Sequence, residues 1–577
     1  QGGSTSSGGF FTGPRSRQPV PTAELDGTVS GDFFTVLCVG QGFTEDQWMN
    51  VYSFSMLRHW LLTYHFGSTY DRSEVDGSVV SMVSATSSSS RLLPPKERVR
   101  EKAFQYCQRL IEQSDRKAHK RTDTDLQKAC LVEAVCILDC VCEEDASLVY
   151  RTFPCIKALF GRLSSDLSFA RVLLPIAQFY LNHGEMAAVD CESVWKLVFD
   201  RFPAELFNDH FLAHELLRFL RLNLESLQLR VPQYTRSFPN LLKFLAWDSP
   251  AVVDDFVDLL PSLVTAGTAV ELLHTLLDLP CLSATLVLQV RSTSLPISEP
   301  GGRDTIDRLS TLHELLAETA NWPRVVQCAQ TVPMLLHIFF NTVITVADEK
   351  LLAHLVLVML ERSSLLLNIP KYNKEIHRVF SSHLLRLCKL HPSLVVDQSH
   401  ELLEFAGATA NVYNKEEIYT HAVWVLGEYL SVSCDSRCSV SLITSCFEAL
   451  EAVLFEITSS APPPGADCPA PRVVTTLMSA LAKLASRSHD LIPRVSLFLS
   501  KLRTVTRGGP VAWCSDEEDL VAIVMRGEEL WSLLKAPGVA QSVLTPPPHV
   551  TTPQWHRDTN VAMPLRLRAL TNLTHSH

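Results

Sequence analysis

Metal chemistry is the first possibility that the residues raise, because His-Glu-Leu-Leu occurs three times in this 577-residue chain, at residues 214–217, 313–316 and 400–403. A zinc-protease helix needs a second histidine four residues after the first, so that both imidazoles face one metal from adjacent turns. That fourth position is occupied by Arg218, Ala317 and Glu404. The zinc-protease interpretation therefore fails at all three places. We expect each His-Glu pair to begin an exposed helix face over Leu-Leu core contacts.

The densest group of thiols offers a second possible metal site, formed by Cys130, Cys136, Cys140 and Cys142. On one helix Cys136 and Cys140 share a face, but Cys142 points about 200° away from Cys140 at about 100° per residue. Structural zinc sites usually take two ligands from a Cys-x-x-Cys turn, which these residues do not form. We expect buried core cysteines and predict no metal site. The dilute cysteines of the whole chain favour a reducing compartment, the cytoplasm.

Nucleotide chemistry needs a glycine-rich loop ending in Gly-Lys-Ser/Thr, because glycine amides and one lysine must surround the phosphates. The chain contains no Gly-Lys dipeptide. Residues 343–349 could form an apolar strand that ends in Asp-Glu and holds magnesium. The end of a helix, a turn and an N-cap at Asp348 fit these residues better. We therefore predict no catalytic residues, no cofactor and no enzymatic activity.

The strongest basic cluster consists of Arg116, Lys117, Lys120 and Arg121. It could contact phosphates or an anionic membrane surface. Acidic residues flank it at Asp115, Asp123 and Asp125, which favours a solvated turn between helices. A net charge of −11 excludes a strongly basic nucleic-acid-binding protein, so we expect no direct nucleic-acid contact.

The elements that carry these residues are helical almost throughout. Apolar residues recur with helical period from Pro94 onward, in segments about 20 residues apart, so that a pair takes about 40, the spacing of HEAT and armadillo repeats. Prolines recur at the expected joints, among them Pro154, Pro261 and Pro333, and Asp123 is the expected N-cap of a helix over 125–142. The pattern predicts an all-α fold, an α-solenoid of HEAT/armadillo-like helical pairs with flexible loops.

Breaks in this pattern divide the chain into expected segments. The entry is a mostly disordered segment (1–43), a helix of a preceding repeat (44–66) and a mobile loop (67–93). The remainder is a first block of helical repeats (94–290), a loop (291–303), a second block (304–458), a Pro-rich loop (459–471) and C-terminal repeats with a tail (472–577).

One helix carries a more specific pattern. The segment 421–430 reads His-Ala-Val-Trp-Val-Leu-Gly-Glu-Tyr-Leu, and it resembles the Trp-x-x-Gly-Glu-Tyr helix in the trunks of adaptin and coatomer large chains. We expect Trp424 to pack in the core, Gly427 to allow a neighbouring helix to approach, and Glu428 and Tyr429 to complete this structural helix. Trp247 and Trp424 are the expected structural anchors.

Longer stretches narrow the resemblance. The stretches 8–11, 32–37, 91–95, 125–135, 238–241, 243–247, 276–282 and 484–488 are similar to the zeta-type large subunits of the fifth adaptor protein complex, and the similarity covers nearly the whole chain. Because the chain begins at Gln1, the resemblance also implies that the family's preceding region is missing. The loop near residues 300–303 is shorter than in that family.

The resemblance implies a non-catalytic scaffold subunit of a heterotetrameric adaptor complex in endosomal vesicle and protein transport. The implied partners are beta, mu and sigma subunits, together with spatacsin and spastizin. The implied location is the cytoplasm, peripheral on late endosomes and lysosomes through indirect membrane contact, with retrieval from late endosomes to the Golgi. The alternative that this family carries is a helicase-like nuclear role in homologous-recombination repair of double-strand breaks, with a nuclear pool. The missing P-loop argues against its chemistry.

Overall fold

The computed structural model describes residues 51–63, 95–115, 121–292, 305–538 and 540. Most of these residues are helical, and the single β-bridge among them joins Val511 to Cys514. The predicted all-α solenoid is confirmed. The chain forms two compact units, Gln1–Phe244 and Leu245–His577, a division that falls inside the predicted first block (94–290).

The first unit begins, among its described residues, with a helix over 51–63. Its further helices are α2 (Pro95–Gln113), α3 (Arg121–Glu144), α4 (Ser147–Leu163), α5 (Ala170–His183), α6 (Glu192–Lys196), α7 (Phe202–Leu206), α8 (His210–Leu222), α9 (Leu224–Arg230), α10 (Pro232–Arg236) and α11 (Phe238–Trp247), whose last residues lie in the second unit. Two short elements complete it, the 3-10 turn η2 (Leu167–Phe169) and the π-helical η3 (Leu197–Arg201).

The second unit contains longer helices. They are α12 (Ser249–Leu263), α13 (Ala269–Leu277), α14 (Leu279–Arg291), α15 (Thr305–Leu315), α16 (Pro323–Val346), α17 (Glu349–Arg362), α18 (Tyr372–Leu390), α19 (Ser393–Asp397), α20 (Ser399–Ala406), α21 (Ala410–Asn414), α22 (Glu416–Tyr429), α23 (Val440–Ser459), α24 (Pro471–Arg487), α25 (Ile492–Thr506) and α26 (Glu517–Leu534). The 3-10 turns η4 (Ala317–Asn321) and η5 (His489–Leu491) precede α16 and α25.

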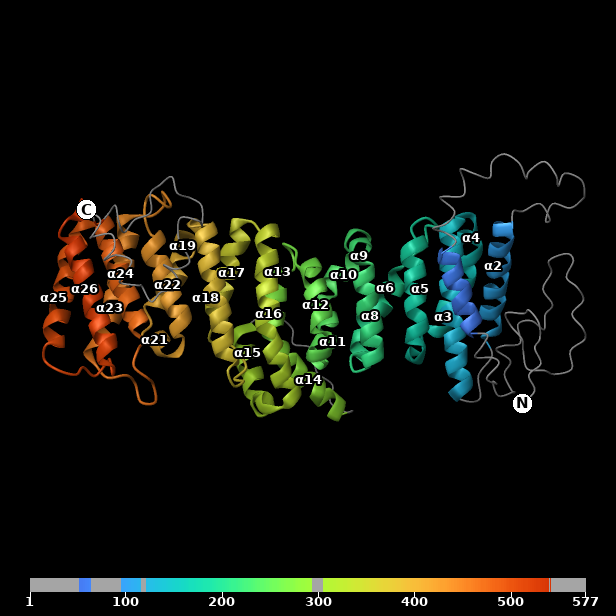
Figure 1. Cartoon of the computed structure of the whole chain (residues 1–577), viewed down its shortest axis with the longest axis horizontal. Coiled ribbons are helices and arrows are strands. Elements are labelled where there is room, and N and C mark those ends of the chain that lie inside the picture. Colours follow the sequence, from blue (N-terminus) through green and yellow to red (C-terminus); the bar gives the residue numbers. More distant parts are fainter. Residues whose placement is uncertain (1–50, 64–94, 116–120, 293–304, 539, 541–577) are drawn as a thin grey trace, which may run out of the picture. The chain divides into compact units, whose positions relative to one another are not determined.

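Alternate helices pack on one another, as a solenoid requires. In the second unit α12, α16, α18, α22, α24 and α26 form one row in which each helix contacts the next (Figure 1). The helices α17, α20 and α23 form a second row. In the first unit α2, α3, α5 and α8 are joined in the same way. Each helix buries an apolar face between its neighbours, so the core runs through each unit instead of closing around a single cavity.

Helix starts follow the expected local chemistry at several joints. The carboxylate of Asp348 accepts a hydrogen bond of 2.8 Å from the backbone N–H of Leu351, so Asp348 is the N-cap of α17. Residues 343–346 belong to α16, and the helix–turn–N-cap interpretation is correct where the strand would have been wrong. Asp209 and Ser439 cap α8 and α23 in the same way.

Other joints were predicted wrongly. Asp123 lies inside α3, which begins at Arg121, so it is not an N-cap. Pro154, Pro261 and Pro333 lie inside α4, α12 and α16 and do not separate helices. A proline removes one N–H from the helix ladder, and tertiary packing on both sides outweighs that local cost here.

One described helix, α16, is long and apolar enough by length and composition to cross a membrane, and α13 with α14 would pass as a bent pair. The side chains of Leu335, Phe339 and Val343 on α16 are fully buried in the core of the second unit. This is the pattern of a central solenoid helix.

Several predicted segments fall partly or wholly outside the described residues. The entry segment (1–43), the loop 67–93, residues 293–303 of the second loop and the tail from 541 lie outside the described residues. The Pro-rich segment 459–471 links the last residue of α23 to the first residue of α24.

Candidate functional site

The four residues singled out on the adaptin-like helix all lie on α22 and are all buried. Trp424 is 6% exposed and Tyr429 is 1% exposed, and their rings meet edge to face with centroids 5.9 Å apart. Edge-to-face contact is a favoured arrangement of aromatic pairs. The helix is surrounded by α18, α20 and α24. These side chains therefore face neighbouring helices and not solvent.

Gly427 marks the closest approach of α22 to α24. A Cβ atom added at this position would lie 2.8 Å from both the Cα and the Cβ of Ala480. Real Cβ atoms essentially never come so close, and one of the two contacts is to backbone, which cannot rotate away. Glycine is thus required here by packing, although its backbone is ordinary helix.

Next to this contact, a buried ion pair joins the same two helices. Lys483 Nζ of α24 lies 2.8 Å from Glu428 Oε2 of α22, and the side chains are 10% and 9% exposed. The ammonium also lies 5.1 Å from the centroid of the Trp424 ring. Burial lowers the pKa of Lys483, and the neighbouring Glu428 carboxylate opposes that shift. The pair is therefore a desolvated ion pair that connects α22 to α24.

Arg487 completes the junction at the end of α22. Its Nη1 donates hydrogen bonds to the carbonyl oxygens of Gly427 (2.6 Å) and Leu430 (2.7 Å), and its Nη2 donates to that of Glu428 (3.0 Å). The last carbonyls of a helix have no partner within the helix, so a guanidinium that bonds three of them satisfies an otherwise costly end. The contacts of Gly427, Glu428, Lys483 and Arg487 therefore stabilise the packing of α22 against α24.

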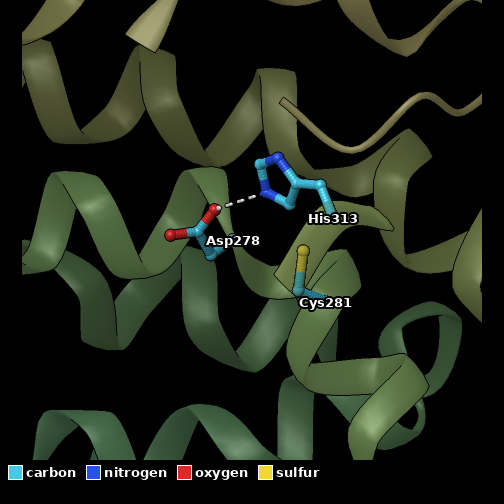
Figure 2. Close-up of side chains that lie close together, drawn as sticks. All are labelled: Asp278, Cys281 and His313. Atoms are coloured by element: carbon cyan, nitrogen blue, oxygen red, sulfur yellow. Dashed lines mark ion pairs between the residues drawn. The ribbon is translucent and has the colours of Figure 1, made fainter. Parts of the chain in front are cut away.

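A second cluster was not predicted from the sequence. Asp278, at the N-cap of α14, and Cys281, in its first turn, meet His313 of α15 (Figure 2). One ligand atom from each residue lies within 4.8 Å of the other two, and His313 Nε2 is 3.8 Å from Asp278 Oδ1. Asp278 also binds Arg362 of α17, whose Nη1 donates to Oδ2 at 3.2 Å and whose Nη2 contacts Oδ1. Burial raises the pKa of the Cys281 thiol.

This cluster corrects one expectation. His313 does not begin an exposed face over two core leucines, because its side chain is 12% exposed and directed at Asp278, while Leu315 is 75% exposed. His214 and His400 are exposed, as expected. One usable signal for this cluster was the Asp-x-x-Cys spacing at the start of a helix, but the third member of the cluster comes from another helix.

The remaining candidate residues lie apart from both clusters. Arg116, Lys117 and Lys120 fall outside the described residues, and Arg121 is the first residue of α3, with a side chain that the structure does not describe. Trp247 is half-buried, and the guanidinium of Arg324 lies 3.9 Å from its ring centroid. Burial raises the pKa of the Cys130 and Cys142 thiols to about 12, so both are protonated core side chains.

Comparison with known proteins identifies the family. AP-5 complex subunit zeta-1 of mouse is 50% identical to this chain over an alignment of 605 residues. The alignment covers 98% of the chain and 75% of the mouse protein. The human protein of the same name is 50% identical over 611 residues, covering 99% of the chain and 75% of the relative. The chain belongs to the AP-5 complex zeta-1 subunit family. No solved structure matches it significantly.

Three family models, each described as an AP-5 complex subunit, match successive parts of this zeta-1 family member. A model described as AP-5 complex subunit zeta-1, C-terminal TPR repeats, matches residues 255–300 and 295–573. A model described as AP-5 complex subunit, vesicle trafficking, matches 126–243, and one for zeta-1 TPR repeats matches 1–85. The α22–α24 junction and the Asp278 cluster both lie in the C-terminal TPR region.

Proposed function

We propose that the chain is a non-catalytic scaffold subunit of an AP-5-type adaptor complex, with beta, mu and sigma subunits as its partners. Spatacsin and spastizin associate with this assembly. It acts in protein transport from late endosomes to the Golgi, from a cytoplasmic location peripheral to late endosomes and lysosomes. The observation that carries the proposal is 50% identity over 98% of the chain to a protein named AP-5 complex subunit zeta-1.

The packing of the second unit supports a scaffold. Two of its buried polar contacts, Lys483–Glu428 and Arg362–Asp278, each connect one helix to another. Stacked helix pairs present long surfaces on which partner subunits can bind. The residues Trp424, Gly427, Glu428 and Tyr429 hold α22 in this stack and have a structural role.

The test uses cells in which the chain's own gene has been deleted. A tagged wild-type chain should co-purify with the beta, mu and sigma subunits and should appear on late endosomes. A Gly427→Leu variant, which forces a side chain into Ala480, should lose both properties. Gly161→Leu is the matched control, because nothing lies within 4 Å of a Cβ built there. A chain that is found only in the nucleus, or that co-purifies with none of the three subunits, contradicts the proposal.

Membrane association through partners is tested separately. Reversing the charge of Arg116, Lys117, Lys120 and Arg121 should leave recruitment to endosomes unchanged, because we assign recruitment to the partner subunits. If this variant lost binding both to anionic vesicles and to endosomes, the basic cluster would contact lipid directly and indirect recruitment would be wrong.

A further inference from the structure

We propose that Asp278, Cys281 and His313 bind one zinc ion, which joins the start of α14 to the last turn of α15. The site rests on the arrangement in Figure 2, where a carboxylate oxygen, a thiol sulfur and an imidazole nitrogen all lie within 4.8 Å of one another.

The ligand types select the metal. Zinc accepts thiolate sulfur, imidazole nitrogen and carboxylate oxygen, whereas magnesium and calcium take oxygen ligands almost alone. Ligands around a zinc ion lie about 2.0–2.3 Å from the metal, so neighbouring ligand atoms are separated by about 3–4 Å. The observed spread of at most 4.8 Å is closed by small side-chain movements.

An unsatisfied nitrogen points to the same place. His313 Nε2 is buried and has no hydrogen-bond partner among the described residues, since Asp278 Oδ1 is 3.8 Å away. A buried polar atom without a partner costs free energy, and each one in a folded protein requires an explanation. A metal between the imidazole and the carboxylate supplies the missing contact of the imidazole nitrogen.

The fold places the ligands firmly. Asp278 and Cys281 are three residues apart at the first turn of α14, so their side chains reach the same side. Cys281 is 3% exposed and the Asp278 side chain is 23% exposed. The thiol is thus shielded from solvent, while the carboxylate edge leaves access for the ion and for a water molecule as fourth ligand.

Arg362 lies in the second layer around this site. The cation and its two anionic ligands sum to zero charge, so the guanidinium faces a neutral set and not a bare cation. Arg362 Nη2 contacts Asp278 Oδ1, so a metal bound at Oδ1 must share that oxygen with the guanidinium or displace it. The hydrogen bond of 3.2 Å from Nη1 to Asp278 Oδ2 can persist in either case. Carboxylate ligands are commonly held by such outer partners.

Binding is a substitution at sulfur. The Cys281 S–H bond breaks, the sulfur electron pair forms the bond to zinc, and the proton leaves to the buffer. Asp278 and neutral His313 each donate a lone pair without losing a proton. One zinc bound therefore releases one proton, which calorimetry measures as a buffer-dependent binding enthalpy.

The experiment uses the intact chain, stripped of metal by chelation, with zinc and cobalt as probes. We expect one zinc per chain, one proton released, and a near-ultraviolet thiolate-to-cobalt charge-transfer band. Cys281→Ala and His313→Asn should each weaken zinc binding by more than the roughly 10–100-fold that the loss of an outer partner costs, and Cys281→Ala should abolish the cobalt band.

Controls separate this site from other ligands on the chain. Cys328→Ala removes another fully buried thiol and His354→Asn removes an exposed imidazole, and neither should change zinc affinity. Thermal unfolding without metal shows which variants still fold, and the less buried His313→Asn remains informative if Cys281→Ala does not. Zinc affinity unchanged in a folded His313→Asn variant, or a wild-type chain that binds no zinc, overturns the proposal.

Discussion

Glu428 and Lys483 form an ion pair of 2.8 Å between α22 and α24, and each side chain is only about a tenth exposed. Neither charge is well solvated, so each depends on the other and on neighbours that include the three-carbonyl contact of Arg487. Together with the close approach of Gly427 to Ala480, this pair explains why a Gly-Glu dipeptide stands near the end of α22, after the apolar run 422–426.

Adding a single methyl group at Gly427 should destabilise the second unit. Gly427→Ala places a Cβ 2.8 Å from Ala480, and overpacking of this kind costs about 1–3 kcal/mol. Gly267→Ala is the control in the same unit, where only the Thr265 hydroxyl lies near, at 4.0 Å. Thermal unfolding of both variants measures the difference. Equal stability of the two would mean that the α22–α24 contact is looser than described.

Removing one member of the buried ion pair should cost more than removing both. Lys483→Met leaves the Glu428 carboxylate buried without its ammonium partner, and we expect a loss of about 3 kcal/mol. The double variant Lys483→Met/Glu428→Leu should recover part of that loss, because no charge remains to be solvated. Denaturant unfolding of the two single variants and the double variant gives the coupling. Strictly additive losses would show that the pair does not act as a unit.

Acid should destabilise the second unit through His383. Burial lowers the pKa of His383 from 6.5 to about 3, with further contributions from His337, whose Nδ1 lies 2.7 Å from its Nε2, and from Arg386. The folded pKa is below the unfolded one, so this stability is present above pH 6.5 and is lost as pH falls toward 3.

The expected size follows from about 1.4 kcal/mol per pH unit for one proton. Between pH 7 and pH 5 the wild-type chain should lose about 2 kcal/mol more than His383→Asn. The exposed His400→Asn should keep the wild-type slope. Unfolding measured across this range decides, and a His383→Asn variant with the wild-type slope would show that His383 does not titrate as described.

The N-cap of α17 offers a smaller effect. Asp348→Ala removes the hydrogen bond of 2.8 Å to the Leu351 N–H and should cost about 1 kcal/mol. Glu361→Ala, in the last turn of the same helix, is the control. It removes a negative charge from the negative helix end and should be neutral or slightly stabilising. Chemical denaturation compares the two, and a harmless Asp348→Ala would refute the capping role.

Much of the fold was predictable because it depends on local signals. Helical periodicity predicted the solenoid, and the sequence 343–349 was resolved correctly as helix, turn and N-cap because Asp348 can satisfy a helix start by itself. Pro154, Pro261 and Pro333 misled the prediction because their local cost is outweighed by packing that the sequence does not display.

The candidate sites depend on pairing between distant residues. Glu428 is 55 residues from its partner Lys483, and His313 is 35 residues from Asp278, as their numbers show. A search for a second ligand one turn along the same helix could not find a partner that lies on another helix. The resemblance to adaptins pointed to α22 from the sequence alone. Its contacts with Arg487 and Lys483 became visible only in the structure.

Co-expression of the chain with beta, mu and sigma subunits of an AP-5 complex, followed by native mass spectrometry, tests the central claim most directly. We predict a single assembly that contains one copy of each of the four chains, and we predict that Gly427→Leu prevents its formation while Gly161→Leu does not. A stable beta–mu–sigma assembly from which the wild-type chain is absent would contradict the account.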